Sequence, residues 1–466
     1  MNGLFDTVML SRLQFAVTIM FHMLWPVVTI GLSLFLVTLE GLWIRTGDRH
    51  YYVHARFWSR LFVLFTALGV VTGIPMEFQF GMNWSVFSVA GGDFFGNVLG
   101  FEGAMAFMLE ATFLGIMLFG WDRVPPKVHL FATCMVAFGA SLSAFWILVA
   151  NSWMQVPAGG YFDNGRFVVT SYREAMFNID MPWSVTHMWF ACLEITAFMV
   201  GAVSAWYIYR RKHVAFFLTS FKLALLAALV TAPLQVFIGD GLGRSIAEIQ
   251  PVKLAAMESH WKTNPPGVGA PFLVVAWPDM AARENLWEVS IPSLLSVLTT
   301  HSLTGEVKGL RDFPPENLPP IAINFYAFRV MVTLGTALVL LMLWTIWKWK
   351  KGGLTPESAP GEKWLLISWM LAWPASLVAM ETGWIVREVG RQPWIIYGVL
   401  RTGDAASPIP VGTVSTSLAA FIAIYVMLLV VFFVVGRYLI SRGPDLDGDS
   451  GGTAETHTDS SRQGAA

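Results

Sequence analysis

Long apolar runs separated by short polar segments dominate this chain. Nine of the runs are long enough to cross the hydrocarbon core of a bilayer, which takes about 20 residues of α-helix. They lie at 13–44, 56–80, 97–120, 128–153, 184–209, 216–239, 321–347, 364–386 and 412–437. The pattern predicts an all-α integral membrane protein with nine transmembrane helices.

Two further segments do not have this pattern. The connection 240–320 lies between the six helices of 1–239 and the three helices of 321–440, and its length indicates substrate handling or a structural cap. Within it, residues 247–262 are predicted to form a short amphipathic helix at the outer surface. The tail 441–466 is rich in Gly, Ser, Thr and Asp and is predicted to be a disordered cytoplasmic segment.

Composition supports a membrane protein and excludes other classes. Of 466 residues, 55% are hydrophobic and only 13% are charged, whereas soluble domains carry about 25% charged residues. A net charge of −1 argues against a nucleic-acid partner. Cys134 and Cys192 are too few to form an iron–sulfur or zinc site by themselves. The first apolar run is too long for the h-region of a signal peptide, so no cleaved signal is expected.

Basic residues favour alternate connections. Such residues follow the first, third, fifth, seventh and ninth runs, as in Arg210–Lys212 and at Lys350. The positive-inside rule therefore predicts an outer N-terminus and a cytoplasmic C-terminus. Arg387, Arg391 and Arg401 follow the eighth run on the predicted outer side, against this rule. Cofactor binding is one reason for arginines to lie there.

Four side chains able to bind iron fall in the outer half of the predicted membrane domain: His22, His187, Met331 and Glu381. The helical rise places His22 roughly 15 Å from the outer end of its run. Ionisable groups at such depth are functional candidates by default. Alternatively, each histidine packs helices, the methionine fills the core, and Glu381 pairs with a nearby arginine.

Haem chemistry explains this set of residues together. An iron that only transfers electrons takes two protein ligands, and a His–Met pair raises its reduction potential. An iron that binds oxygen needs an open position and one protein ligand, which His22 or Glu381 could supply. Arg12, Arg387 and Arg391 lie near the outer face, where they could pair with haem propionates or act as ordinary interfacial arginines.

Two carboxylates, Glu102 and Glu110, lie in the otherwise apolar third run. On an ideal helix they are roughly 12 Å apart along the axis and about 80° apart around it. Staggered carboxyl groups suit a proton relay, which Ser143 on the fourth run could extend, or they form structural hydrogen bonds between helices.

Nine motifs make the chain similar to a known family over about 8–440. They are Ser11–Phe15 (SRLQF), Met76–Gly81 (MEFQFG), Phe101–Gly103 (FEG), Gly120–Arg123 (GWDR), Trp146–Asn151 (WILVAN), Lys253–Glu258 (KLAAME), Phe328–Met331 (FRVM), Glu381–Trp384 (ETGW) and Gly390–Trp394 (GRQPW). These strings resemble subunit I of the cytochrome bd-type quinol oxidases. The connection 240–320, the Q-loop of that family, looks short, as in the branch that includes the cyanide-insensitive oxidases.

The resemblance implies three haems. His187 and Met331 match the ligands of the low-spin haem b558, and Arg329 matches a cofactor-binding residue beside that haem. His22 and Glu381 match the single ligands of two high-spin haems, b595 and d (or a third b-type haem), in an order that differs between members.

The resemblance also implies the roles of four other residues and the partners. Lys253 and Glu258 match the quinol-site residues of the Q-loop, and Glu102 and Glu110 match proton-path carboxylates. The expected protein is an inner-membrane terminal oxidase subunit that oxidises quinol at the outer face and reduces O2 to water without pumping protons. It would work with a haem-free second subunit and often with a small single-helix subunit.

Two other function classes remain open. A secondary transporter would also use buried carboxylates, but many such folds contain an internal repeat, and none is evident here. A haem-bearing electron-transfer subunit without oxygen chemistry would need only a site of the His187/Met331 type.

Overall fold

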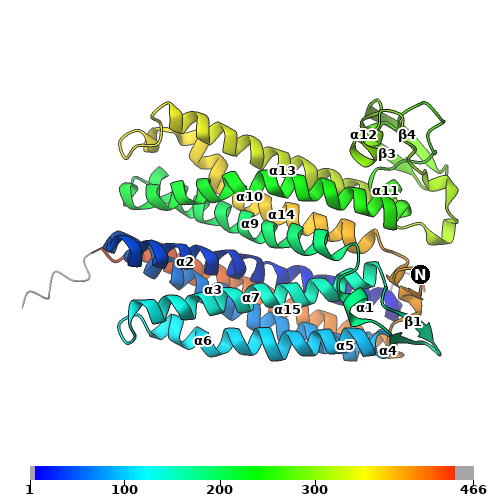
Figure 1. Cartoon of the computed structure of the whole chain (residues 1–466), viewed down its shortest axis with the longest axis horizontal. Coiled ribbons are helices and arrows are strands. Elements are labelled where there is room, and N and C mark those ends of the chain that lie inside the picture. The colour runs from blue at the N-terminus through cyan, green and yellow to red at the C-terminus, as the bar shows by residue number, and fades with distance from the viewer. Residues whose placement is uncertain (1–5, 447–466) are drawn as a thin grey trace, which may run out of the picture.

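A computed structural model describes residues 6–446, so most of the predicted disordered tail lies outside the described residues. Within 6–446, nine helical stretches are long and apolar enough to cross a membrane, which confirms the predicted number. All of them run along the long axis of the molecule (Figure 1). The helices that form them are α1 (Thr7–Met23), α2 (Pro26–Thr46), α3 (Arg49–Met82), α5 (Gly92–Phe101), η1 (Glu102–Phe107), α6 (Met108–Phe119), α7 (Pro126–Gln155), α9 (Met181–Tyr209), α10 (Val214–Ile249), α13 (Ile321–Lys350), α14 (Lys363–Val389) and α15 (Val411–Arg442).

Two of the predicted runs contain a change of helical geometry. The first run consists of α1 and α2, because Pro26 lacks the N–H that a continuous helix would need and instead starts α2. His22 therefore lies in the last turn of α1 rather than in the middle of one long helix. The third run contains the π-helix η1, a rare wider turn that is frequent at functional sites.

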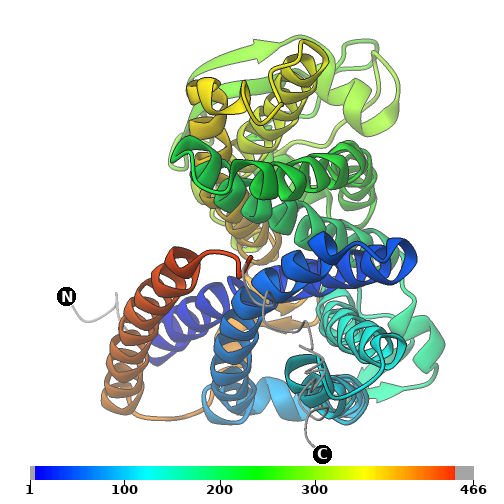
Figure 2. The ribbon, with the colours of Figure 1, turned by 90° about the vertical axis from the view of Figure 1, so that its left-hand side faces the viewer.

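Helix α9 occupies the centre of the bundle. It packs against α10 and α14 on one side and against α2 and α7 on the other, as the end-on view shows (Figure 2). Its buried side chains contribute to the largest apolar core, which α2, α3, α10 and α14 complete. Helix α15, by contrast, packs mainly on α1 and α3 and leaves most of its apolar surface exposed.

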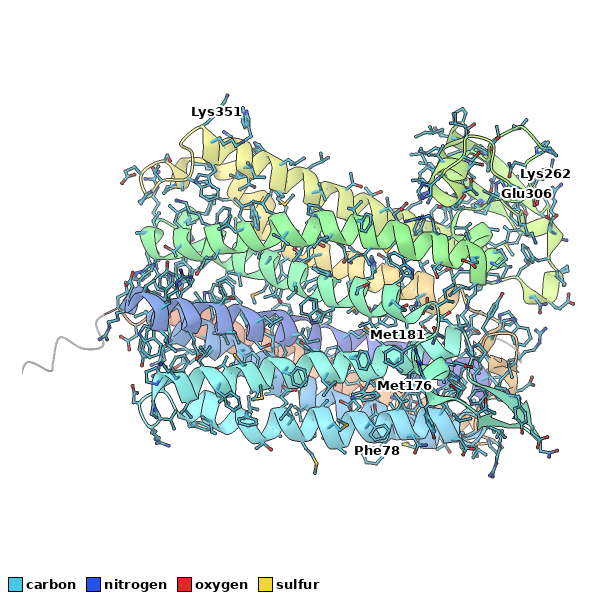
Figure 3. The ribbon with its side chains drawn as sticks, in the orientation of Figure 1. Phe78, Met176, Met181, Lys262, Glu306 and Lys351 are labelled. Atoms are coloured by element: carbon cyan, nitrogen blue, oxygen red, sulfur yellow. The ribbon has the colours of Figure 1, made fainter. Side chains whose placement is uncertain are left out.

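Short elements cover the end of the bundle opposite to Lys351, where Lys262 and Glu306 lie (Figure 3). They are α4 (Ser85–Ala90), β1 (Gly160–Asp163), β2 (Arg166–Val169), α8 (Tyr172–Met176), α11 (Pro251–Met257), β3 (Phe272–Asp279), β4 (Glu284–Ile291), α12 (Leu294–Thr300), η2 (Leu310–Asp312), η3 (Pro315–Asn317), β5 (Trp394–Ile396), β6 (Leu400–Arg401) and η5 (Thr402–Asp404). The strands form three separate antiparallel pairs, β1–β2, β3–β4 and β5–β6. The remaining short helix, η4 (Ala359–Gly361), precedes α14.

The predicted surface helix over 247–262 is wrong. Helix α10 continues to Ile249, and Pro251 then starts the separate short helix α11. All six residues from Val252 to Met257 are buried, because Trp261, Leu310 and Ile321 pack over α11. The sequence pattern missed this because two of the covering residues, Leu310 and Ile321, lie more than 50 positions away in the sequence.

Candidate functional site

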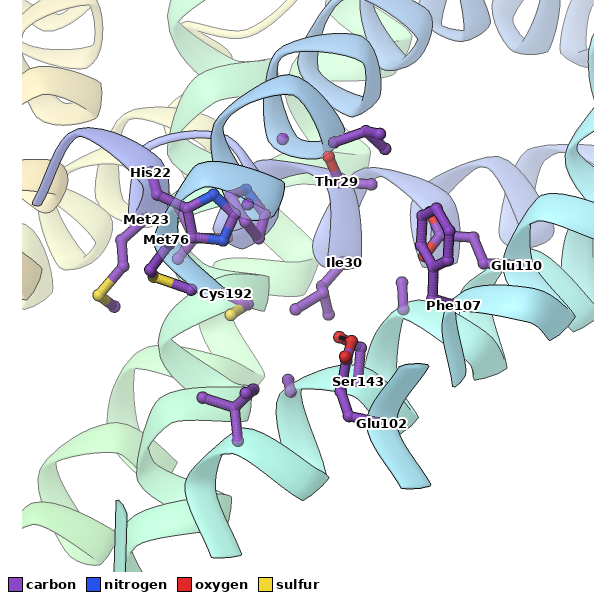
Figure 4. Close-up of a pocket in the computed structure, with 18 of the residues that line it drawn as sticks. His22, Met23, Thr29, Ile30, Met76, Glu102, Phe107, Glu110, Ser143 and Cys192 are labelled. Carbon is purple, nitrogen blue, oxygen red and sulfur yellow. Dashed lines mark hydrogen bonds between the residues drawn. The ribbon is translucent and has the colours of Figure 1, made fainter. Parts of the chain in front are cut away.

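A cavity of about 360 Å³ lies between the first five membrane-crossing stretches, and Trp384 of α14 also lines it (Figure 4). His22 from α1, Glu102 from η1 and Glu110 from α6 all line it, so the structure brings together three of the predicted site residues. Most of the remaining wall is apolar, as at Ile30 and Leu148. Ionisable groups in such a place are expensive unless they bind something or exchange protons.

The π-helix changes the predicted arrangement of the two carboxylates. The angle of about 80° between Glu102 and Glu110 assumed α-helical geometry, and η1 replaces that geometry over Glu102–Phe107. Both carboxylates nevertheless line the same cavity. Ser143 on α7 donates a hydrogen bond of 2.6 Å to Glu102 Oε1, so the predicted extension of the relay has a direct contact.

A third carboxylate, Glu77 on α3, lines this cavity and was assigned no role from the sequence. It is close enough to Glu102 for the two charges to interact, and Glu102 interacts in the same way with Glu110. Val70, Gly73 and Glu77 are three and four residues apart, so they lie on one face of α3, and all three line the cavity. This spacing is visible in the sequence. The spacing alone does not reveal that a cavity adjoins this face.

The imidazole of His22 has a fixed neighbour. Its Nδ1 lies 2.9 Å from Oγ1 of the buried Thr72 on α3. The Thr72 hydroxyl is also 2.7 Å from the backbone carbonyl of Leu68. A hydroxyl has a single proton, and the Leu68 carbonyl can only accept it. We therefore infer that Thr72 accepts from the Nδ1–H of His22, which leaves the Nε2 lone pair free.

The other three predicted iron ligands, His187, Met331 and Glu381, lie outside this cavity lining. Within residues 6–446, His187 Nδ1 and both carboxylate oxygens of Glu381 are buried without a hydrogen-bond partner. Glu381 therefore does not pair with Arg387 or Arg391, which was its alternative role.

A glycine lies next to the side chain of three of the four predicted iron ligands. A Cβ atom at Gly383 would lie 3.0 Å from the sulfur of Met331, and one at Gly239 would lie 3.2 Å from Cε1 of His187. A Cβ at Gly73 would lie 3.1 Å from Cε1 of His22. Glycine permits this close approach.

These features fit a bound haem. Buried polar atoms without partners are rare and need an explanation, and a metal ion satisfies an imidazole nitrogen or a carboxylate oxygen. The donor set is also suitable for iron, because imidazole and thioether are known axial ligands of haem. The residues present therefore fit haem better than they fit simple helix packing.

The predicted propionate-binding arginines differ in how many free donors they have. Arg387 is occupied, because it donates to Asn151 and forms an ion pair of 2.8 Å with Asp180. Arg391 forms an ion pair with Glu388, yet its Nε and Nη1 are buried without partners among the described residues. Arg391 is thus the better candidate to bind a further anion.

The remaining predicted arginines lie on α1 and α13. Arg12 is half-buried in the N-terminal half of α1, and Asp6 is the charged group that acts on it. Arg329 donates to Glu258 at 2.6 Å and to the backbone carbonyl of Leu273, also at 2.6 Å. Its Nη1 is buried without a partner within 6–446.

Lys253 on α11 is only 2% exposed. Its Nζ donates a 2.7 Å hydrogen bond to Gln155 at the end of α7. Burial lowers the pKa of Lys253 well below its ordinary value, and the positive charges of Arg387 and Arg391 lower it further. The ammonium group of Lys253 therefore loses its proton more readily than that of an exposed lysine.

Glu258 follows α11 and is held differently. Burial raises the pKa of its carboxyl group above the ordinary value, and the ion pair with Arg329 opposes this rise only in part. Lys253 and Glu258 therefore share one sequence motif but contact different helices, α7 and α13 respectively.

Sequence reasoning missed the polar residues around Lys253. Gln155 accepts from Lys253 and donates to Glu388, and Gln250 donates to Gln155. Asp180 lies at the start of α9, where burial alone would raise its pKa, but Arg387 holds the pKa below its ordinary value. These residues come from four helices or their ends, so only the tertiary structure reveals the cluster.

Comparison with known proteins gives consistent results. A family profile described as "Cytochrome bd terminal oxidase subunit I" matches residues 10–444. The chain is 34% identical to cytochrome bd-II ubiquinol oxidase subunit 1 of Escherichia coli K12, covering 92% of this chain and 95% of that protein. It is also 34% identical to cytochrome bd ubiquinol oxidase subunit 1 of Bacillus subtilis 168, covering 94% of each.

A solved structure shares the fold. The bd oxidase from Geobacillus thermodenitrificans superimposes with a TM-score of 0.86 at 32% identity, covering 95% of this chain and 100% of that chain. With the nine membrane-crossing stretches of 6–446, these matches confirm a multi-pass protein of the bacterial inner membrane. Membership of this family implies haem cofactors and a second oxidase subunit. The chain belongs to the cytochrome bd terminal oxidase subunit I family.

Proposed function

We propose that this chain is the quinol-oxidising and oxygen-reducing subunit of a terminal oxidase, a quinol:oxygen oxidoreductase. The observation that carries the proposal is the cavity in which His22 lies together with Glu77, Glu102 and Glu110. A transporter would explain buried carboxylates, but it would not explain the glycines next to His22, His187 and Met331.

Haem, when bound, supplies one-electron redox chemistry and an iron that can bind oxygen. His187 and Met331 would hold the low-spin haem b558, because they offer an imidazole and a thioether ligand. His22 and Glu381 would each provide the single ligand of a high-spin haem, b595 and d or a third b-type haem. Arg391 and Arg12 would bind propionates, and the roles of Arg387 and Arg329 are then to orient Asp180 and Glu258.

Quinol oxidation is proposed to involve Lys253 and Glu258. Burial lowers the pKa of Lys253 and raises that of Glu258, and in their unprotonated forms the amine and the carboxylate could accept the two protons that quinol releases with its electrons. Gln155 and Arg329 fix the two groups from separate helices, so a quinol head group near both would be oriented. The basic residues in alternate connections place this region outside.

Oxygen reduction would draw its protons through the cavity carboxylates. Glu110 and Glu102 line the same cavity as His22, with Ser143 bound to Glu102 and Glu77 as a third carboxylate. Proton release outside and proton uptake from the cytoplasm separate charge without a pump. The complex would contain the family's haem-free second subunit and possibly a small single-helix subunit.

Two substitutions that should fail differently test this function. Glu110→Gln keeps the side-chain shape but cannot carry a proton, so oxygen consumption should fall while the haem spectrum is retained. His22→Ala should deplete a high-spin haem. Glu194→Gln is a matched control, because Glu194 is buried on α9 but does not line the cavity. Full oxygen consumption in Glu110→Gln, or an intact high-spin spectrum in His22→Ala, would contradict the assigned role.

A further inference from the structure

The β3–β4 hairpin of the Q-loop carries an uncovered apolar face. Trp287, Val289 and Ile291 alternate along β4 and therefore point to one side of the sheet. Val275 on β3 pairs directly with Val289, and Trp277 lies two positions further along the same strand. All five side chains are exposed, from 43% at Val275 to 57% at Val289. An apolar patch of this kind on a soluble loop indicates an interaction site.

The opposite face of the hairpin packs against the membrane domain. Leu273 and Ala276 are buried against Phe325 of α13. The hydroxyl of Tyr326 donates to the Ala276 carbonyl at 3.0 Å, and Arg329 donates to the Leu273 carbonyl at 2.6 Å. The position of the hairpin along α13 is therefore fixed by direct bonds.

These bonds give the depth of the hairpin relative to the membrane. Arg329 lies eight residues into α13, about 12 Å along its axis. Helix α13 has 30 residues, a length of about 45 Å, whereas the hydrocarbon core is about 30 Å thick. The outer part of α13 thus extends past the hydrocarbon by up to about 15 Å, and β3 lies beside that part. The hairpin is consequently at the level of the outer lipid head groups.

We propose that the apolar face of the β3–β4 hairpin is embedded in the outer leaflet of the membrane. Figure 2 shows the light-green segment that carries β3 and β4 spreading beyond the outline of the helices at the top. Ile323 and Val330 of α13, close in the sequence to the hairpin contacts Tyr326 and Arg329, are also exposed apolar residues. Trp277 and Trp287 belong to the residue type that is enriched at the membrane–water interface.

The polar residues of the hairpin agree with this orientation. Asp279 and Glu284 pair at the turn, and Glu288 points to the other side of β4 from Trp287 and Val289. Glu288 pairs with Ala276 on the face that packs against α13, but its own side chain is exposed, and Glu284 is exposed at the tip. The acidic groups therefore lie at the tip and on the packed face, where water can reach them, so the hairpin lies in the interface and does not cross it.

The hairpin is also bonded to the proposed quinol site, and its role there rests on the proposed function. Asn285 of β4 accepts from Ser259 and from Trp261, which lie one and three positions after Glu258. Arg329 joins Glu258 to Leu273 of β3. A lipid-embedded hairpin would therefore bring the acyl-chain region, in which quinol is dissolved, next to Glu258.

Spin labelling of the intact oxidase in lipid nanodiscs tests the membrane contact. Cys134 and Cys192, the two native cysteines of the chain, are replaced by alanine, and a nitroxide is attached at Val289→Cys or at Glu288→Cys. Background labelling is measured on the complex without an introduced cysteine. Frequent collision of the nitroxide with dissolved oxygen indicates that the label lies in lipid. Frequent collision with a water-soluble nickel complex indicates that it lies in water. We expect the label at 289 to favour oxygen and the label at 288 to favour nickel.

Two results would overturn the proposal. Nickel access at both positions would place the apolar face in water, and low access of both reagents at 289 would indicate a protein partner. If either variant loses its haem spectrum, Ile291→Cys and Ser290→Cys repeat the comparison one pair further along β4. If the collision data contradict the proposal but the labelled oxidase oxidises quinol at the normal rate, the lipid contact is refuted and the oxidase function is not.

Discussion

The hydrogen bond between Thr72 and His22 allows a specific prediction about haem retention. Thr72→Val keeps the shape of the side chain but removes the oxygen that accepts from His22 Nδ1 at 2.9 Å. A neutral hydrogen bond contributes about 0.5–1.5 kcal/mol. Loss of the group that orients a metal-binding histidine typically lowers metal affinity about 10–100-fold. We therefore expect haem at His22 to be held about 10–100-fold more weakly.

The assay compares haem loss between variants of the purified oxidase. Each variant is incubated with apomyoglobin, which takes up released haem, and reduced-minus-oxidised spectra are recorded over time. The high-spin signal should decline faster in Thr72→Val, while the low-spin b-type bands should stay unchanged because His187 and Met331 are untouched. Thr72→Ser should behave as the native protein, since serine keeps the hydroxyl.

A matched control separates this effect from a general loosening of α3. Thr66 lies on the same helix and lines the same cavity, and its buried hydroxyl has no partner among residues 6–446. Thr66→Val should therefore leave haem retention unchanged. Equal retention in Thr72→Val and the native protein would refute the positioning role, and so would equal loss in the two valine variants.

Three further predictions concern the outer half of the protein. Met331→Leu and His187→Ala should each abolish the low-spin alpha band, because that iron would lose one of two ligands; an unchanged band in either variant would exclude the ligand pair. Lys253→Ala and Glu258→Ala should lower the steady-state rate of quinol oxidation and leave the haem spectra intact. Lys262 is exposed in the same connection, so Lys262→Ala should not lower the rate. Native rates in Lys253→Ala and Glu258→Ala would exclude the quinol site. Because burial lowers the pKa of Lys253 below its ordinary value of 10.5, the unfolded chain binds one more proton between those two pKa values, and stability should rise with pH there. Lys253→Met should flatten that rise in thermal unfolding of the complex, and an identical pH dependence would contradict the lowered pKa of Lys253.

The sequence was sufficient to predict the number of membrane-crossing helices, because the length of an apolar run can be compared directly with the thickness of a bilayer. It also identified His22, Glu102 and Glu110, since ionisable residues are conspicuous in apolar runs. Local changes in helix geometry were less accessible. Pro26 could have indicated the start of α2, but nothing in 102–107 identifies a π-helix rather than an α-helix.

The features that sequence reasoning missed depend on contacts between distant segments. Thr72 contacts a histidine 50 positions away, and Lys253 bonds to Gln155, 98 positions away. Glu77 was visible as a membrane carboxylate, but its role depends on which helices adjoin α3. The burial of α11 likewise comes from later residues of the Q-loop, so its own amphipathic pattern was misleading.

The visible absorption spectrum of the purified complex, recorded reduced and then with carbon monoxide, tests the central claim most directly. The proposed ligand set predicts low-spin b-type bands from the His187/Met331 site that carbon monoxide does not change. It also predicts a high-spin signal from the His22 and Glu381 sites that carbon monoxide shifts. Low-spin bands alone would indicate an electron-transfer subunit without oxygen chemistry, and a spectrum without haem bands would contradict the oxidase function.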